Sequence, residues 1–171
     1  GPVRVEPLGL AGDRRWMVVD PDGEQVTQRE EPALTQVHPL PRPDGGLILR
    51  AAGLPDLAVP PPAAVDPVEV AVWGFRLPAA PADPQAERWL TKLLDRPVRL
   101  VWLDDPTRRP VDPAYGQPAD RVSFADGYPL LLTNAASLDA LNEWMLAAGD
   151  PEAPLPMTRF RPNVVVAGAR P

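Results

Sequence analysis

The chain has 171 residues, a formal net charge of −6, 26 prolines, 12 glycines and no cysteine. The acidic balance argues against non-specific binding to nucleic acid or to an anionic membrane, and no apolar run approaches the ~20 residues that span a bilayer. The lack of cysteine excludes a disulfide, a thiolate metal ligand and a cysteine nucleophile from this chain. We therefore expect a cytoplasmic protein with no nucleic-acid or membrane partner.

The proline content alone would fit collagen or a disordered chain, because it is about three times the ordinary usage of ~5%. Collagen is excluded because glycine shows no period of three. Disorder is disfavoured because leucine and valine are abundant and five tryptophans add large apolar side chains. The prolines are therefore interpreted as connections within a folded chain.

Short β-rich stretches predict strands along most of the chain. The first stretch ends at a Pro21-Asp22-Gly23 turn, so the next is expected to return as the second strand of a hairpin. Proline runs at 60–62 and 78–84 are expected to lie between strands, where no ladder N–H is needed. The predicted strands cover residues 15–20, 25–28, 47–50, 68–73, 98–103, 128–132 and 163–167.

Two helices are predicted among these strands. The first covers residues 84–95, with Asp83 as its N-cap and a proline in the first helical position. The second opens at Thr133-Asn134 and ends near Gly149. Apolar stripes support both helices, formed by Trp89, Leu90, Leu93 and Leu94 in the first and by Leu138, Leu141 and Met145 in the second. The pattern predicts a mainly β or α+β fold, barrel-like with a few short helices.

Common catalytic motifs are absent from the sequence, which has no glycine-rich phosphate loop and no His-Glu-x-x-His pattern. The single histidine, His38, precedes a proline and is interpreted as structural or solvated. The acidic pairs Glu30-Glu31 and Asp104-Asp105 are interpreted as solvated turns, because adjacent side chains point apart. The pattern therefore predicts no catalytic residue and no metal ligand.

Arginines cluster in this acidic chain. Their planar guanidinium groups suit bidentate binding of phosphate or carboxylate, whereas the simpler interpretation is surface ion pairing with the excess acids. From spacing alone, ion pairing is favoured. The clusters are Arg14-Arg15, Arg108-Arg109, and Arg159 with Arg161.

Three longer segments follow the order of one known family. They are GLAGDRRWMVVD at 9–20 with VTQREEPAL at 26–34, VSFADGYPLLLT at 122–133 with ASLDALN at 136–142, and RFRPNVVV at 159–166. Together they resemble MOSC-domain proteins, a family that includes the mitochondrial amidoxime-reducing component and its bacterial relatives. The resemblance runs along essentially the whole chain.

This resemblance implies a MOSC-type β-barrel, with residues 1–105 as the N-terminal barrel-like region and residues 106–171 as the first part of the MOSC domain. It also implies a molybdopterin-type molybdenum cofactor and two-electron reduction of N-hydroxylated small molecules. Electrons would come from an iron–sulfur or heme protein or domain.

The same resemblance implies six cofactor-binding residues. An arginine in the first segment falls on the pterin phosphate, a loop in the second lines the cofactor, and the third supplies another arginine and a nearby asparagine. Guanidinium groups and backbone N–H donors suit an anionic phosphate, and a glycine allows close backbone approach. The six residues are Arg14, Asp126, Gly127, Tyr128, Arg161 and Asn163.

Structural alternatives stay open for these positions. Arg14 could pair with Asp13 or Asp20 and fix a turn, residues 126–127 could form only a turn before the next strand, and Asn163 could satisfy a strand edge. For the two arginines the ordered match favours cofactor contact.

The chain also departs from the family pattern. The family begins with a Tyr-Pro-Val-Lys-Ser strand that this chain lacks. It also continues past the Arg-Pro-Asn strand to a molybdenum-ligating cysteine, whereas this chain has no cysteine. The resemblance therefore predicts a fragment without the metal ligand, inactive alone. Two alternatives are a carrier that delivers the cofactor or transfers sulfur to it, and a non-catalytic binding module.

Overall fold

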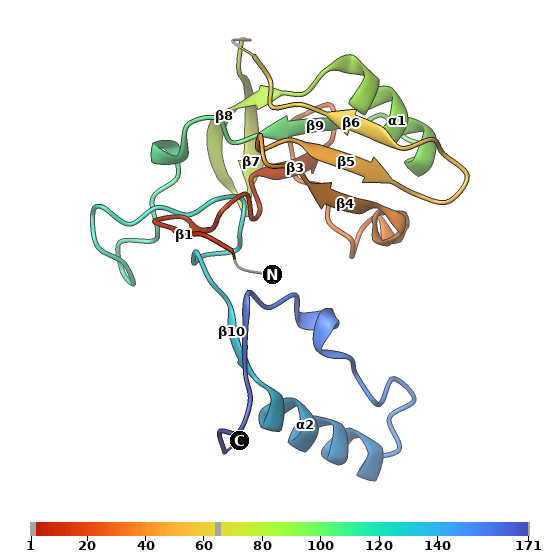
Figure 1. Cartoon of the computed structure of the whole chain (residues 1–171), viewed down its shortest axis with the longest axis vertical. Coiled ribbons are helices and arrows are strands. Elements are labelled where there is room, and N and C mark those ends of the chain that lie inside the picture. Colours follow the sequence, from red (N-terminus) through yellow and green to blue (C-terminus); the bar gives the residue numbers. More distant parts are fainter. Residues whose placement is uncertain (1–2, 64–65, 171) are drawn as a thin grey trace. The chain divides into compact units, whose positions relative to one another are not determined.

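The computed structural model describes residues 3–63 and 66–170. The chain divides into two compact units, residues 1–127 and residues 128–171 (Figure 1). In both units the regular structure combines strands with an α-helix, which confirms the predicted mainly β or α+β fold class.

The N-terminal unit is built mostly from strands. Its single-turn elements are the 3₁₀ helices at Pro32–Gln36 and Pro106–Arg108. The other elements are β1 (Val5–Glu6), β2 (Gly9–Leu10), β3 (Trp16–Val19), β4 (His38–Pro41), β5 (Leu47–Arg50), β6 (Leu57–Val59), β7 (Val68–Val72), β8 (Phe75–Pro81), α1 (Pro84–Leu94) and β9 (Arg99–Trp102).

Two antiparallel sheets dominate this unit, one in the order β3-β9-β8-β7 and the other in the order β4-β5-β6. In the first, Trp16 lies opposite Trp102 and Val19 opposite Arg99, so the predicted strands at 15–20 and 98–103 are confirmed and adjacent. The strands predicted at 47–50 and 68–73 are also confirmed, as β5 and β7. Pairing among the described residues gives four separate sheets rather than one closed barrel.

The four-stranded sheet buries one hydrophobic cluster. Alternate side chains of β7 and β8 point to the same face because side chains along a strand alternate between faces. Phe124, which lies in a loop far along the chain, also packs into this cluster. Its buried members are Val19, Val70, Val72, Leu77, Ala79, Val101, Leu103 and Phe124.

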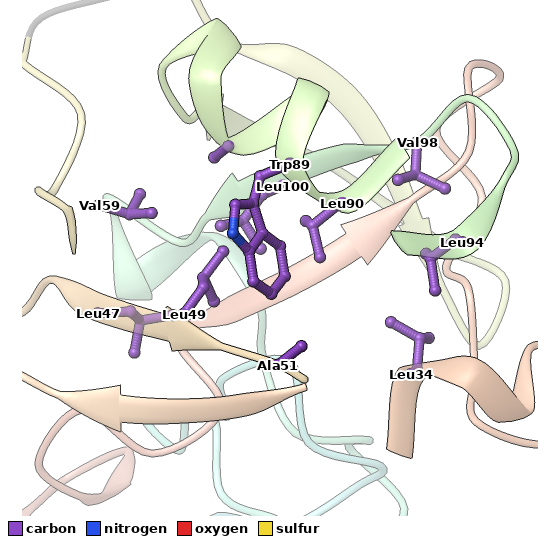
Figure 2. Close-up of a cluster of buried hydrophobic side chains, with 11 residues drawn as sticks. Leu34, Leu47, Leu49, Ala51, Val59, Trp89, Leu90, Leu94, Val98 and Leu100 are labelled. Carbon is purple, nitrogen blue, oxygen red and sulfur yellow. The ribbon is translucent and has the colours of Figure 1, made fainter. Parts of the chain in front are cut away.

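Helix α1 covers a second hydrophobic cluster. Trp89 and Leu90 point from the helix toward Leu49 of β5 and Leu100 of β9 (Figure 2). The Trp89 indole N–H donates to the carbonyl oxygen of Pro55 at 2.7 Å, so its one polar group is satisfied. The apolar stripe that predicted this helix is therefore the face that it buries.

The predicted N-cap of α1 is confirmed. The Asp83 carboxylate accepts a hydrogen bond from the Gln85 backbone N–H at 2.7 Å, and Pro84 occupies the first helical position. We expect Asp83→Ala to lower the free energy of unfolding by about 1 kcal/mol, because one N–H at the helix start loses its acceptor. Urea denaturation measures this loss, and Asp83→Ser, which restores an acceptor, should recover most of it. Equal stability of the alanine variant and the wild type would contradict the assignment.

The hairpin expected at residues 25–28 forms only in part. After the turn the chain returns antiparallel to β3, with a bridge between Val19 and Gln25 and the Val26 N–H donating to the Val18 carbonyl oxygen at 2.9 Å, but no regular strand forms over residues 25–28. The reason is local, because the Thr27 N–H and hydroxyl both donate to the Glu30 carboxylate at 3.1 Å and turn the chain away from the sheet.

Residues 78–84 were expected to lie between strands. This is wrong for residues 78–81, because Pro78 and Pro81 belong to β8. Pro78 lies opposite Glu69, and its carbonyl oxygen accepts from Arg108 Nη1 at 3.1 Å. A residue whose polar groups face away from the partner strand loses no ladder bond when it is proline. The run at 60–62 does lie between β6 and β7.

The C-terminal unit contains a parallel strand pair joined through a helix. Its elements are β10 (Leu132–Asn134), α2 (Ala135–Ala147), a 3₁₀ helix (Met157–Phe160) and β11 (Val164–Val166). The Asn134 side chain caps α2 by accepting from Ala136 N–H at 3.1 Å, and Gly149 follows the helix with φ = 71°, so both predicted ends are confirmed.

The strand predicted at 128–132 is largely wrong, because β10 begins only at Leu132. Pro129 has no N–H to donate, and the Leu131 N–H donates to the Asn163 side chain at 2.9 Å instead of to a strand. The strand predicted at 163–167 is confirmed as β11.

Candidate functional site

In the N-terminal unit, the structure brings the loop of residues 122–127 against the segment that precedes β3. The Phe124 backbone N–H donates to the Arg14 carbonyl oxygen at 2.9 Å, and the Phe124 ring packs into the cluster beneath the sheet. Arg14 and Asp126 are more than a hundred positions apart in sequence, yet they belong to adjacent segments. Two predicted site positions therefore share one region of this unit.

Arg14 occupies a special backbone position. Its φ is 49°, in the left-handed region that few residues other than glycine adopt, and its guanidinium forms an ion pair with the Asp13 carboxylate. The Arg14 side chain is 19% exposed, so it is largely covered yet still reaches the surface. The ion pair with Asp13 is the contact that the structural alternative predicted for this residue.

Asp126 is held at two points. Its carboxylate Oδ1 accepts a hydrogen bond from the Trp73 indole N–H at 3.1 Å, and its backbone carbonyl accepts from Arg109 Nη2 at 2.9 Å. The next residue, Gly127, has open space beside it, since a Cβ there would meet no other heavy atom within 4 Å. Asp126 and Gly127 are both exposed. Trp73 and Arg109 therefore hold this loop, while Asp126 and Gly127 stay accessible to solvent.

Arg109 is a functional candidate that the sequence did not single out. It is only 5% exposed, and Nη1 donates to the carbonyl oxygens of Ser123 and Ala125. Burial lowers the pKa of the Arg109 guanidinium, and the nearby Asp126 carboxylate partly opposes this. The only sequence signal was its membership of the Arg108-Arg109 pair, whose other member makes the expected surface ion pair with Asp104.

A second arginine beside this region is also partly buried. Arg15 Nε donates to the Leu103 carbonyl oxygen at 3.0 Å, and its guanidinium lies 5.3 Å from the centroid of the Trp102 ring. Burial lowers the Arg15 pKa, while Glu6 and Asp104 oppose this. Its contacts tie the segment before β3 to the end of β9, which indicates a structural role.

In the C-terminal unit, Asn163 fixes the start of the strand pair. Its Oδ1 accepts from the Leu131 N–H, and its own N–H donates to the Leu131 carbonyl oxygen, both at 2.9 Å. This is the strand-edge contact that the structural alternative predicted. Arg161 ends the preceding 3₁₀ helix with φ = 52° and is exposed, and the Tyr128 side chain is half exposed.

The six predicted positions therefore fall into two groups. Arg14, Asp126 and Gly127 belong to the N-terminal unit, whereas Tyr128, Arg161 and Asn163 belong to the C-terminal unit.

The C-terminal unit also contains a hollow of about 570 Å³ between α2 and the strand pair. Its lining is mostly apolar and does not include Arg161. Apolar walls of this kind do not suit an anionic phosphate. The hollow is therefore not a candidate binding site for the phosphate that the predicted arginines would bind. The lining includes Leu132, Leu138, Leu141, Met157, Phe160 and Val166.

Within residues 3–63 and 66–170, no group of three or more histidine, cysteine, aspartate or glutamate side chains is placed to hold a metal ion. In the same described ranges, no helix is both long and apolar enough to cross a membrane.

Comparison with known proteins identifies related sequences over most of the chain. The family model of the MOSC N-terminal beta barrel domain matches residues 2–97, and that of the MOSC domain matches residues 119–171. The mitochondrial amidoxime-reducing component 1 of mouse is 32% identical over 167 residues, and the human protein of that name is 31% identical. The cattle mitochondrial amidoxime reducing component 2 is 30% identical over 166 residues.

These matches cover 94% of this chain but 47% of each of those three relatives. The chain therefore spans about half the length of the curated relatives that it matches. A solution structure of a Bordetella bronchiseptica protein aligns with 57% of this chain and 85% of its own, at 20% identity and a TM-score of 0.47.

Proposed function

The chain belongs to the MOSC family, and from this premise we propose that it is part of a molybdenum-cofactor-dependent oxidoreductase that reduces N-hydroxylated compounds. The observation that carries the proposal is the family match over both parts of the chain, together with relatives named for amidoxime reduction. An amidoxime is an N-hydroxylated amidine, so the relatives' name supplies the substrate class. The proposal also keeps the domain boundary between residues 105 and 106, with the N-terminal barrel-like region before it and the first part of the MOSC domain after it.

The residues of the N-terminal unit suit the phosphate end of a molybdopterin. Arg14 supplies a guanidinium that can bind phosphate oxygens in a bidentate manner, and the open space beside Gly127 allows a ligand to approach the backbone. Arg161 in the C-terminal unit supplies a second guanidinium. Tyr128 precedes β10 in the sequence, and Asn163 immediately precedes β11. We propose that these residues, with Asp126, line the cofactor.

This chain does not supply every group that the cofactor needs. Its sequence has no cysteine, so a thiolate ligand to molybdenum would have to come from outside these 171 residues. When bound, the cofactor supplies the two-electron redox chemistry, whereas this chain binds and orients its anionic end. Electrons come in this proposal from an iron–sulfur or heme partner, the substrate is a small molecule, and the location is cytoplasmic.

The test is a reductase assay on the longer protein that contains this segment, purified with its cofactor and supplied with a chemical electron donor. We expect reduction of a hydroxylated amidine to the amidine, and no turnover by the 171-residue chain alone. Bound molybdenum without turnover would overturn the reductase proposal in favour of a cofactor carrier. A protein with neither molybdenum nor turnover would overturn both and leave a non-catalytic binding module.

A further inference from the structure

The buried guanidinium of Arg109 serves one short loop. Its donors reach the carbonyl oxygens of Ser123, Ala125 and Asp126, three residues within a span of four. A buried charge is retained only where polar partners replace the water that it loses. Here the hydrogen-bond partners of the guanidinium are backbone carbonyls of one segment and not a carboxylate. The contacts therefore fix the conformation of that segment.

We propose that Arg109 is the positioning residue of the cofactor loop, holding residues 123–126 in the conformation that presents Asp126 and Gly127 outward. This inference rests on the proposed function and adds to it a residue that itself stays buried beneath the loop. The peptide bonds here are trans, so the N–H that follows each held carbonyl points away from Arg109. Holding the Ala125 and Asp126 carbonyls thereby sets the direction of the Asp126 and Gly127 N–H groups.

Trp73 provides the second fixed point. It lies in the two-residue turn between β7 and β8 with φ = 52°, where glycine, asparagine or aspartate is usual, and it is half exposed. Its indole N–H donates to the Asp126 carboxylate at 3.1 Å. Arg109 therefore holds the backbone of Asp126 while Trp73 holds its side chain.

The separation of the donors explains why the residue is an arginine. Two nitrogens of one planar group reach three carbonyl oxygens, whereas a lysine ammonium is a single point on a flexible stem. A lysine would keep the positive charge but would not hold all three carbonyls at once. The Arg109→Lys variant therefore separates the effect of charge from the effect of geometry.

The first experiment uses the 171-residue chain and requires no cofactor. Arg109→Met, Arg109→Lys and the matched control Arg108→Met are compared by amide hydrogen exchange and by the indole N–H signals of tryptophan, with Trp73 assigned from Trp73→Phe. We expect exchange in residues 122–127 to rise about tenfold or more in both Arg109 variants, and the Trp73 signal to move. The signals of Trp16, Trp89 and Trp102 and the behaviour of Arg108→Met should match the wild type.

A general loss of stability would raise amide exchange throughout the N-terminal unit, whereas the proposal requires a change confined to the loop and Trp73. Should Arg109→Met fail to fold, the lysine variant carries the same test. Unchanged loop exchange and an unmoved Trp73 signal in a folded Arg109 variant would overturn the proposal.

The second experiment measures the pterin content of the longer protein carrying the same substitutions. We expect Arg109→Lys to reduce pterin content about tenfold relative to Arg108→Met. Faster exchange in residues 122–127 together with full pterin content would overturn the role of Arg109 in cofactor positioning. A wild-type protein without any pterin would instead overturn the proposed function, and the exchange result would still decide whether Arg109 holds the loop.

Discussion

Replacing Leu90 by alanine is expected to lower the free energy of unfolding of the N-terminal unit by about 3 kcal/mol, within the usual range of about 2 to 5. Leu90 is 1% exposed and lies where α1 meets both sheets, so its removal leaves a cavity that close-packed neighbours fill only in part (Figure 2). Urea denaturation followed by tryptophan fluorescence measures the loss.

The matched control is Arg88→Ala, two positions earlier on the same helix and exposed to solvent. This substitution should change the free energy of unfolding by less than about 0.5 kcal/mol. A loss below about 1 kcal/mol for Leu90→Ala would contradict the packing of α1 against the sheets.

Replacing Arg14 by glutamine is expected to weaken molybdopterin binding to the longer protein about 30-fold, which corresponds to about 2 kcal/mol. The reason is the loss of a charge-assisted contact to the pterin phosphate from a side chain that is already ordered by Asp13. The dissociation constant is measured on the cofactor-free protein from the fluorescence of the oxidised pterin in the bound fraction.

Arg42 offers a matched control, because it pairs with the nearby Asp44 much as Arg14 pairs with Asp13 but lies between β4 and β5. Arg42→Gln should leave the dissociation constant unchanged. Equal affinities of the Arg14→Gln and Arg42→Gln proteins would show that Arg14 only fixes its turn, as the structural alternative holds.

Local chemistry made several elements predictable from sequence. An aspartate followed by proline marked the start of α1, and its apolar stripe marked the buried face. Alternating valines marked β7, and a capping asparagine marked the start of α2. In each case the determining interactions lie within a few residues of one another.

The departures from the predicted elements depend on side-chain contacts that periodicity does not encode. Strand β8 contains prolines, which the sequence pattern placed between strands, and the Pro78 carbonyl oxygen accepts from Arg108, thirty positions later in the chain. The expected hairpin after β3 is cut short beyond Val26, because Thr27 binds Glu30 instead of the sheet. Sequence periodicity carries no information on either contact.

Some residues of the candidate site were predictable from sequence and others were not. Family resemblance located Arg14 and Asp126, and the structure places their segments together through the Phe124 N–H. Arg109 and Trp73 were not predicted, because an arginine that binds backbone carbonyls and a tryptophan in a tight turn have no sequence pattern of their own. The roles of Arg109 and Trp73 follow only from the folded structure, in which both residues contact Asp126.

In the proposed function, this chain helps to hold a molybdenum cofactor. The most direct test is the pterin and molybdenum content of the longer wild-type protein, purified from cells that make the cofactor. The account predicts about one pterin and one molybdenum per chain, and reduced pterin in the Arg14→Gln protein. A folded wild-type protein that carries neither pterin nor molybdenum would contradict the claim.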